Sequence, residues 1–217
     1  AMGDVMYFVS NGYIVFMPDV HFTIGTPGQS CYDAVVSGTE YLLEQGIAHP
    51  GKIGLQGHSW SGFQTSYLVT KTDLFTCANI GAPITDMVTG YLGIRGGSGL
   101  PRYFMYEEWQ SRMGKNLWEA KDKYLANSAI IEADKIHTPL LIWHNDKDEA
   151  VAYEQGRALY LAMRRLQRPA WHLNYKGEGH FLSNQAAQKD WTIRMMQFFD
   201  YYLKGTKEPR WMKEGIH

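Results

Sequence analysis

Five short apolar runs, rich in β-branched and aromatic residues, alternate along this chain with segments of helical periodicity. The runs cover Tyr13–Met17, Lys52–Gln56, Thr76–Ile80, Pro139–Trp143 and Ala170–Tyr175. Runs of this length and composition are typical of strands. Strands that alternate with helices build a parallel sheet that helices cover on both faces. The pattern therefore predicts the α/β class, with a mainly parallel sheet as the middle of three layers.

The helical segments have recognisable ends. Ser30 is a good N-cap and predicts a long helix from Ser30 to about Gln45. Further helices are expected after Ser59, from about Tyr153, and in a last segment that stops at Gly205. The stretch Gly93–Met113 differs, because glycines and a proline break its periodicity and aromatic residues crowd the remainder. We expect it to be an irregular excursion over one edge of the sheet.

Length and charge limit the classes of partner. At 217 residues the chain predicts one domain over residues 1–217. Its 21 Lys and Arg against 22 Asp and Glu give a formal net charge of −1. Proteins that bind nucleic acids or anionic membranes through their charge carry an excess of basic residues. This chain has no such excess, so both are disfavoured as partners. No apolar run reaches the ~18 residues of a membrane span. His144, Asp146 and His172 match no zinc spacing, and neither a metal nor a cofactor is expected.

The sharpest local signal is the sequence Gly-His-Ser-Trp-Ser-Gly at residues 57–62, directly between a predicted strand and a helical segment. This pattern is typical of a nucleophile elbow, a strained turn whose residues two before and two after the serine must be small. Gly57 meets this requirement, and Ser61 replaces the usual glycine. Ser61 does not fit as the nucleophile, because the residues two before and two after it are Ser59 and the bulky Phe63. Ser59 is therefore the candidate nucleophile, and a plain surface turn is the alternative.

A serine hydroxyl needs a base, and the base needs a group that fixes its tautomer. A histidine between glycines, His180, follows the fifth predicted strand and is the candidate base. A polar turn after the fourth predicted strand contains two candidate acids, Asp146 and Asp148. Catalytic groups collect at this end of parallel strands. The order of serine, acid and histidine along the chain is that of the α/β-hydrolases.

These residues resemble the prolyl oligopeptidase family of serine peptidases, within the α/β-hydrolase superfamily. The resemblance covers nearly the whole chain and includes the elbow, Ala82-Pro83 after the third predicted strand, Thr138–Ile142 leading to His144, and Glu178-Gly179-His180. In that family the acid is the fourth residue after the histidine that ends the strand, which selects Asp148 over Asp146. Asn145 stands where the family usually has glycine.

The resemblance implies acyl transfer through Ser59, His180 and Asp148, with the backbone N–H of Trp60 in the oxyanion hole. Tyr91, Tyr103 and Tyr106, in the aromatic-rich stretch, are candidates for lining a substrate pocket, and Tyr91 is the one we select. Local packing of the crowded aromatic residues is the alternative. Met87 and Gly90 occupy places where proline-cleaving members have aromatic residues, so a preference for proline is not expected. The substrate would be a peptide or an ester. A serine peptidase is the leading hypothesis, and a carboxylesterase or a non-catalytic hydrolase-like domain is the alternative.

The resemblance also implies that three strands of the family's sheet, and the tyrosine that provides its second oxyanion donor, precede residue 1. A sheet without an interior strand has unpaired backbone groups at the gap. We therefore expect an incomplete hydrolase domain whose sheet is completed by a preceding segment or by a homo-oligomer.

Overall fold

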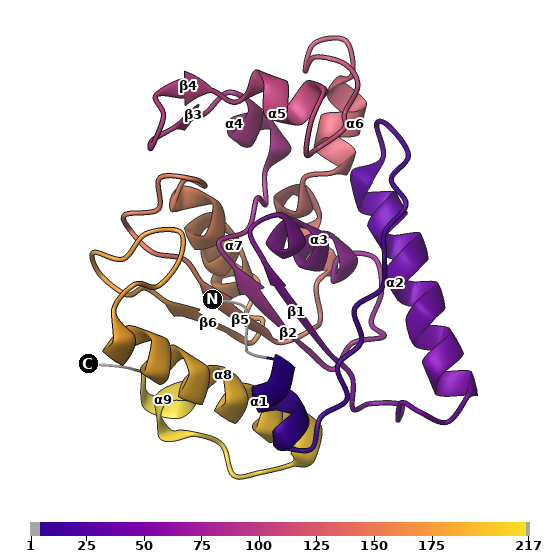
Figure 1. Ribbon diagram of the computed structural model, residues 1–217, viewed down its shortest axis with the longest axis vertical. Coiled ribbons are helices and arrows are strands. Elements are labelled where there is room, and N and C mark those ends of the chain that lie inside the picture. Colours follow the sequence, from indigo (N-terminus) through magenta and orange to yellow (C-terminus); the bar gives the residue numbers. More distant parts are fainter. Residues whose placement is uncertain (1–4, 216–217) are drawn as a thin grey trace.

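Four parallel strands form the central sheet in the computed structural model, which describes residues 5–215 (Figure 1). In spatial order they are β1 (Gly54–His58), β2 (Cys77–Gly81), β5 (Leu140–Trp143) and β6 (Ala170–Leu173). Each strand begins and ends within two residues of one of the predicted runs. The α/β class and the parallel sheet are confirmed.

Helices cover both faces of the sheet (Figure 1). One face carries α1 (Val5–Ser10), α8 (Gln185–Lys204) and α9 (Arg210–Glu214). The other carries α3 (Trp60–Leu68), the 3₁₀ helix η1 (Ala129–Lys135) and α7 (Glu154–Arg165), and α2 (Pro27–Glu44) packs against α3. Among residues 5–215 no helix is long and apolar enough to cross a membrane.

The interior strands bury both of their faces. In β5, Leu141 and Trp143 join the core under α8, whereas Leu140 and Ile142 join the core under α7. Successive side chains of a strand point to opposite faces, so a strand between two helical layers needs apolar residues at every position. This is why the run was visible in the sequence as a continuous apolar segment.

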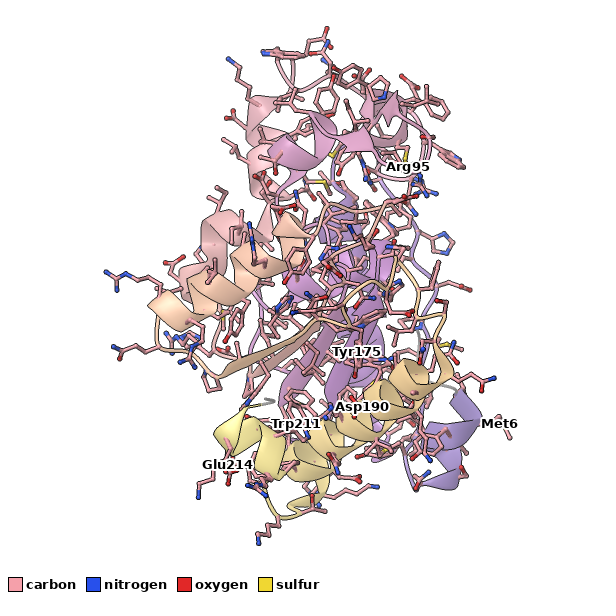
Figure 2. All side chains as sticks on the ribbon, turned by 90° about the vertical axis from the view of Figure 1, so that its left-hand side faces the viewer. Met6, Arg95, Tyr175, Asp190, Trp211 and Glu214 are labelled. Atoms are coloured by element: carbon pink, nitrogen blue, oxygen red, sulfur yellow. The ribbon has the colours of Figure 1, made fainter. Side chains whose placement is uncertain are left out.

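Polar contacts add to the apolar packing of α8. The hydroxyl of Tyr175, just after β6, donates to Asp190 Oδ2 at 2.9 Å (Figure 2). Asp190 also pairs with Arg194 at 2.6 Å, and the guanidinium of Arg194 lies over the ring of Trp211 in α9. The helix ends at Gly205, as predicted, with the left-handed φ of 68° that favours glycine there.

The segment between β2 and β5 forms a small lobe, which we call the excursion (residues 86–128). It contains α4 (Met87–Tyr91), the paired strands β3 (Ile94–Arg95) and β4 (Leu100–Pro101), α5 (Tyr103–Glu107) and α6 (Lys121–Ala126). An irregular excursion was predicted for Gly93–Met113, but over an edge of the sheet. The excursion lies instead beyond the carboxyl ends of the strands (Figure 1). The reason is that the chain enters it from the carboxyl end of β2, which is an interior strand. The excursion therefore stands over the end where catalytic groups are expected.

The run Tyr13–Met17 is not a strand, and this prediction was wrong. It has no regular secondary structure, and within residues 5–215 none of its residues pairs with the edge strand β1. Its side chains contact helices instead. The Tyr13 hydroxyl donates to Asp200 of α8 at 2.7 Å, and the Phe16 ring lies so close to Gly38 of α2 that an added Cβ would be 2.8 Å from it. An apolar run becomes a strand only where a second backbone is beside it.

The first long helix begins at Pro27, three residues before the predicted N-cap Ser30. Proline suits the first helical position because the N–H that it lacks would have no intrahelical acceptor. Ser30 instead lies in the first turn, where its hydroxyl donates to Thr26 O at 2.9 Å and accepts from Thr23 N at 2.9 Å. The serine still stabilises this helix end, but by fixing the entering loop.

Candidate active site

Ser59 occupies the sharp turn between β1 and α3. Its φ of 60° and ψ of −115° lie in a region that non-glycine residues rarely adopt. Such a conformation costs about 1–3 kcal/mol and persists where the surrounding structure enforces it. Here the Ser59 N–H donates to Gly81 O of β2 at 2.8 Å. Ser59 is partly exposed, and its hydroxyl makes no hydrogen bond within residues 5–215. The turn therefore presents an unengaged hydroxyl at the carboxyl end of the sheet.

Close backbone contacts explain the small residues around Ser59. A Cβ on Gly57 would lie 2.0 Å from Ser61 O, and a Cβ on Gly62 would lie 2.5 Å from Gly81 O. Ser61 keeps its hydroxyl within the turn, where it accepts from His58 N and donates to His58 O, both at 2.9 Å. The Ser61 hydroxyl is thus engaged in hydrogen bonds that hold the turn together.

His180 and Asp148, from the loops after β6 and β5, meet at this end of the sheet. His180 Nδ1 lies 2.7 Å from Asp148 Oδ2. Because the carboxylate accepts, the Nδ1 proton donates to it, and the lone pair of the ring is left on Nε2. An imidazole in this tautomer can take a proton at Nε2. The His180 side chain is 14% exposed and the Asp148 side chain is fully buried.

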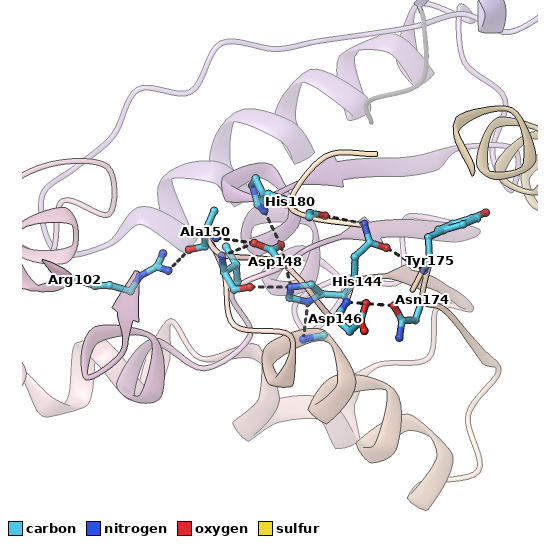
Figure 3. A network of polar contacts seen from close by, with 12 residues as sticks. Arg102, His144, Asp146, Asp148, Ala150, Asn174, Tyr175 and His180 are labelled. Carbon is cyan, nitrogen blue, oxygen red and sulfur yellow. Dashed lines mark hydrogen bonds and ion pairs between the residues drawn. The ribbon is translucent and has the colours of Figure 1, made fainter. Parts of the chain in front are cut away.

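Asp148 is surrounded by hydrogen-bond donors (Figure 3). Its Oδ1 accepts from the backbone N–H groups of Ala150 and Val151, each at 2.8 Å. Its Oδ2 also lies 3.2 Å from His144 Nε2. Burial raises the pKa of the Asp148 carboxyl, but the hydrogen bonds from His144 and His180 outweigh this and hold the pKa well below its usual range. Asp148 is therefore a carboxylate at neutral pH.

His144 has a fixed tautomer. The Gly156 N–H donates to His144 Nδ1 at 3.2 Å, which leaves the proton on Nε2, between Asp148 Oδ2 and Val151 O. In the sequence, this completely buried histidine was considered as a metal ligand and as the landmark from which the acid is counted, but it was given no role in holding that acid. Its position at the end of a predicted strand, four residues before the candidate acid, was the available signal for a role in holding that acid.

Asn145 joins the two loops. Its side-chain amide donates to Gly179 O at 2.8 Å and accepts from Tyr175 N at 3.1 Å. The departure from the family's usual glycine was visible in the sequence, but its consequence was not. Asp146 points elsewhere and accepts from Gly177 N at 2.8 Å. Of the two candidate acids, Asp148 is the one that contacts His180.

His58, the residue before Ser59, packs directly against the candidate base. Its ring stacks on Trp143 at 4.9 Å between centroids and lies 4.7 Å from the ring of His180. Neither of its ring nitrogens has a hydrogen-bond partner. Burial, and then the neighbouring His180, lower the pKa of His58 to about 3. The neutral His58 ring therefore lies between His180 and the core. Because His58 precedes Ser59, this contact places the His180 loop beside the Ser59 turn.

A cleft of about 440 Å³ opens beside His180. Its walls come from the loop after β5, from Gly177 and Gly179 beside His180, and from Arg95 and Gly97 of the excursion. Figure 2 labels Arg95 on this lobe. The Gly97 N–H donates to Glu149 O at 3.3 Å and connects the excursion with the loop of the candidate acid. The cleft is large enough for a short segment of a substrate.

The other candidate residues lie in the excursion and next to Ser59. Trp60 is the first residue of α3, where a backbone N–H has no intrahelical acceptor. Tyr91 is only 3% exposed, and its hydroxyl donates to Glu107 at 2.5 Å. It lies in the aromatic core of the excursion and lines neither this cleft nor the smaller pocket described below. Tyr103 is exposed, whereas Tyr106 lines that smaller pocket.

The three side chains considered as metal ligands are not brought together as a site. His144 binds the candidate acid, Asp146 binds Gly177, and His172 stacks on Tyr160. Across residues 5–215 no group of three His, Cys, Asp or Glu side chains has an arrangement that could hold a metal ion.

Known proteins of similar sequence include peptidases. The chain is 24% identical over 184 residues to the peptidase YuxL of Bacillus subtilis, covering 82% of this chain and 27% of that protein. It is 26% identical over 216 residues to dipeptidyl-peptidase 5 of Porphyromonas endodontalis, covering 89% of this chain and 29% of that protein. The chain thus spans less than a third of the length of these relatives.

A solved acylaminoacyl peptidase, in complex with a peptide chloromethyl ketone, superposes with a TM-score of 0.75 at 22% identity. The match covers 89% of this chain and 31% of that one, and the shared fold is that of the α/β-hydrolase domain. The family model described as "Prolyl oligopeptidase family" matches residues 2–206. The chain belongs to the prolyl oligopeptidase family.

Proposed function

We propose that this chain is the catalytic part of a serine peptidase that cleaves short peptides through an acyl-enzyme. Ser59 is the nucleophile, His180 the general base and Asp148 the group that orients the base. The observation that carries the proposal is the 2.7 Å contact between His180 Nδ1 and Asp148 Oδ2, beside a serine held at a φ of 60°. The names of the peptidases that resemble this chain support peptides as the substrate class.

In the first half of the reaction, Ser59 Oγ attacks the carbonyl carbon of the scissile peptide bond and transfers its proton to His180 Nε2. The negative charge that develops on the carbonyl oxygen is stabilised by the Trp60 N–H. His180 then gives the proton to the leaving amine as the C–N bond breaks, and the acyl group remains on Ser59. Asp148 stays ionised throughout and stabilises the imidazolium.

In the second half, His180 Nε2 takes a proton from water as the water oxygen attacks the acyl carbon. The proton returns to Ser59 Oγ as the ester bond breaks, and the carboxylic acid product leaves. The Ser59 hydroxyl is free to turn toward Nε2, and such contacts often tighten only in the substrate complex. No step requires a cofactor.

Reaction with a fluorophosphonate tests the proposal, because this reagent phosphonylates activated serines. We expect labelling of the folded chain that Ser59→Ala abolishes. Ser61→Ala is the matched control, two residues away in the same turn, and should retain the label. A folded chain that takes up no label would favour a non-catalytic hydrolase-like domain.

Comparing peptide amides with simple esters tests the leaving group. The proposal expects turnover of peptide amides, lost together with ester turnover in Ser59→Ala. Turnover of esters alone by the wild-type chain would assign a carboxylesterase that uses the same three residues.

A further inference from the structure

A second, smaller pocket lies where the excursion meets the loop that carries Asp148. Its volume is about 30 Å³, and its lining includes Ile84, Gly90, Arg102, Tyr106, Val151 and Gln155. A pocket of this size holds a water molecule or a small ion and excludes bulky ligands. The polar side chains that face it determine what it can hold.

Arg102 brings a buried positive charge to this pocket. The residue is 5% exposed, and one terminal guanidinium nitrogen donates to Ala150 O (Figure 3). Its Nε is buried and has no hydrogen-bond partner. Across residues 5–215 no carboxylate lies within ion-pair distance of Arg102. The Ala150 carbonyl and the face of the Tyr106 ring, with its centroid 5.9 Å from the guanidinium, interact with this charge, but no carboxylate does, so a small anion beside it would be favourable.

Tyr106 adds a second unused donor. It is 1% exposed, and its hydroxyl has no hydrogen-bond partner. Burial raises the pKa of Tyr106 to about 12, although Arg102 opposes the shift, so the phenol stays protonated at neutral pH. A Cβ on Gly90 would lie 2.1 Å from the Tyr106 oxygen. Only glycine leaves room for the hydroxyl at this position of α4.

The other polar side chains of the lining have partners. Gln155 Oε1 accepts from the backbone N–H groups of Thr85 and Asp86, and its amide donates to Thr89 Oγ1. The carboxylate of Asp86, whose charge also acts on Tyr106, accepts from Val88 N and from the Thr89 hydroxyl. Arg102 therefore provides a charge without a carboxylate and an unpartnered Nε. Tyr106, whose ring centroid lies 5.9 Å from the guanidinium, provides a hydroxyl that can donate.

We propose that Arg102 and Tyr106 form a binding site for a small monovalent anion. The anion is small enough for the pocket and accepts hydrogen bonds from Arg102 Nε and from the Tyr106 hydroxyl. It is provided either by a carboxylate of the substrate or by a free ion such as chloride. Water fits the volume and would satisfy both donors, but it would leave the charge of Arg102 unpaired.

This site is connected to the candidate acid through one residue. Arg102 holds the carbonyl of Ala150, and the N–H of Ala150 donates to Asp148 Oδ1. A bound anion would hold Arg102 in place and with it the loop of the acid. The site itself stands independently of the proposed function, whereas the substrate source rests on it.

Thermal unfolding of the full chain tests the site without any assay of activity. At constant ionic strength, replacing gluconate, which is too large for the pocket, by chloride or formate should raise the unfolding temperature in a saturable manner. Arg102→Met and Tyr106→Phe should each weaken the apparent affinity roughly 10- to 100-fold. Arg95→Met, which removes another arginine of the excursion that does not line this pocket, should keep the response. Tyr106→Phe removes a single oxygen and serves if Arg102→Met does not fold.

Substrates then distinguish the two sources. A preference for Glu over Gln in matched peptides, lost in Arg102→Met and reduced by chloride, assigns the anion to the substrate. A response to chloride without this preference assigns it to a free ion. If unfolding responds to neither chloride nor formate, or responds equally in Arg102→Met, the anion site is wrong. Fluorophosphonate labelling of each variant reports separately on the proposed catalytic role.

Discussion

The two halves of the candidate active site are built in different ways. In the acid and base half, His180, Asp148 and His144 form a closed set of hydrogen bonds that Asn145 fastens to the neighbouring loop. In the nucleophile half, a strained turn holds Ser59 beside an edge strand, and its hydroxyl has no partner within residues 5–215. The comparison shows that the candidate base is oriented by hydrogen bonds within the chain, whereas the hydroxyl of the candidate nucleophile is not.

The largest effect is expected in the nucleophile half. Ser59→Ala should lower kcat by about 10⁶-fold, because the reaction loses its attacking atom. Ser61→Ala should lower it far less, since Ser61 makes only local hydrogen bonds to His58. Steady-state kinetics on a peptide amide measure both. Equal losses in the two variants would contradict the choice of nucleophile.

In the acid and base half, Asp148→Asn should lower kcat by about 10⁴-fold, because an amide facing His180 Nδ1 favours the wrong tautomer. Asp146→Asn is the matched control, because an amide oxygen can still accept from Gly177 N. The same kinetics compare the two. A greater loss in Asp146→Asn would reverse the assignment of the acid.

Asn145→Ala tests whether the connection between the loops matters for catalysis. Without the amide, Gly179 O and Tyr175 N lose their partner, and misplacement of His180 by about 1 Å would lower kcat up to about 10²-fold. Asn174→Ala removes an exposed hydrogen bond to Asp146 N at 3.2 Å, does not touch Gly179 or Tyr175, and should have little effect. Unchanged kcat in folded Asn145→Ala would show that His180 does not depend on this connection.

His58→Phe should change the acid sensitivity of folding. His58 has a pKa of about 3 in the folded chain against about 6.5 in the unfolded chain, so acidification favours unfolding between these values. In that window, each pH unit of acidification lowers the free energy of unfolding by about 1.4 kcal/mol through His58. Phe removes the dependence.

Denaturant titrations at pH 7.5 and 5.5 measure this difference. It should be about 1.4 kcal/mol smaller in His58→Phe than in the wild type. His21→Phe, at an exposed position, is the control and should leave the difference unchanged. An unchanged difference in His58→Phe would mean that the folded chain does not lower the pKa of His58.

Local patterns in the sequence were sufficient to predict the four strands of the sheet and the position of His180, whereas the choice of Asp148 over Asp146 came from the family resemblance. Strands buried on both faces appear as continuous apolar runs, and the carboxyl ends of parallel strands meet at one edge. The same pattern misidentified Tyr13–Met17, because composition reports that a segment is apolar and not whether another backbone lies beside it. Tyr91 was linked to the substrate because of its aromatic surroundings, and these turned out to be the core of the excursion.

The residues that sequence reasoning missed act through contacts between distant loops. His144 and Asn145 are polar residues at the end of a strand, and only the place of His144 four residues before the candidate acid indicated its role. The hydrogen bond of Asn145 to Gly179 spans 34 positions. The pocket of Arg102 and Tyr106 likewise depends on Gly90, because a side chain there would collide with the Tyr106 hydroxyl. Only the folded structure shows this contact.

The most direct test of the central claim is a crystal structure of the chain after phosphonylation, read for the distance from His180 Nε2 to Ser59 Oγ. We predict a phosphonyl group on Ser59, an Nε2-to-Oγ distance of about 2.6–3.2 Å, and a phosphonyl oxygen at the Trp60 N–H. An imidazole that stays beyond hydrogen-bond reach of Oγ in this adduct would contradict the proposed catalytic role.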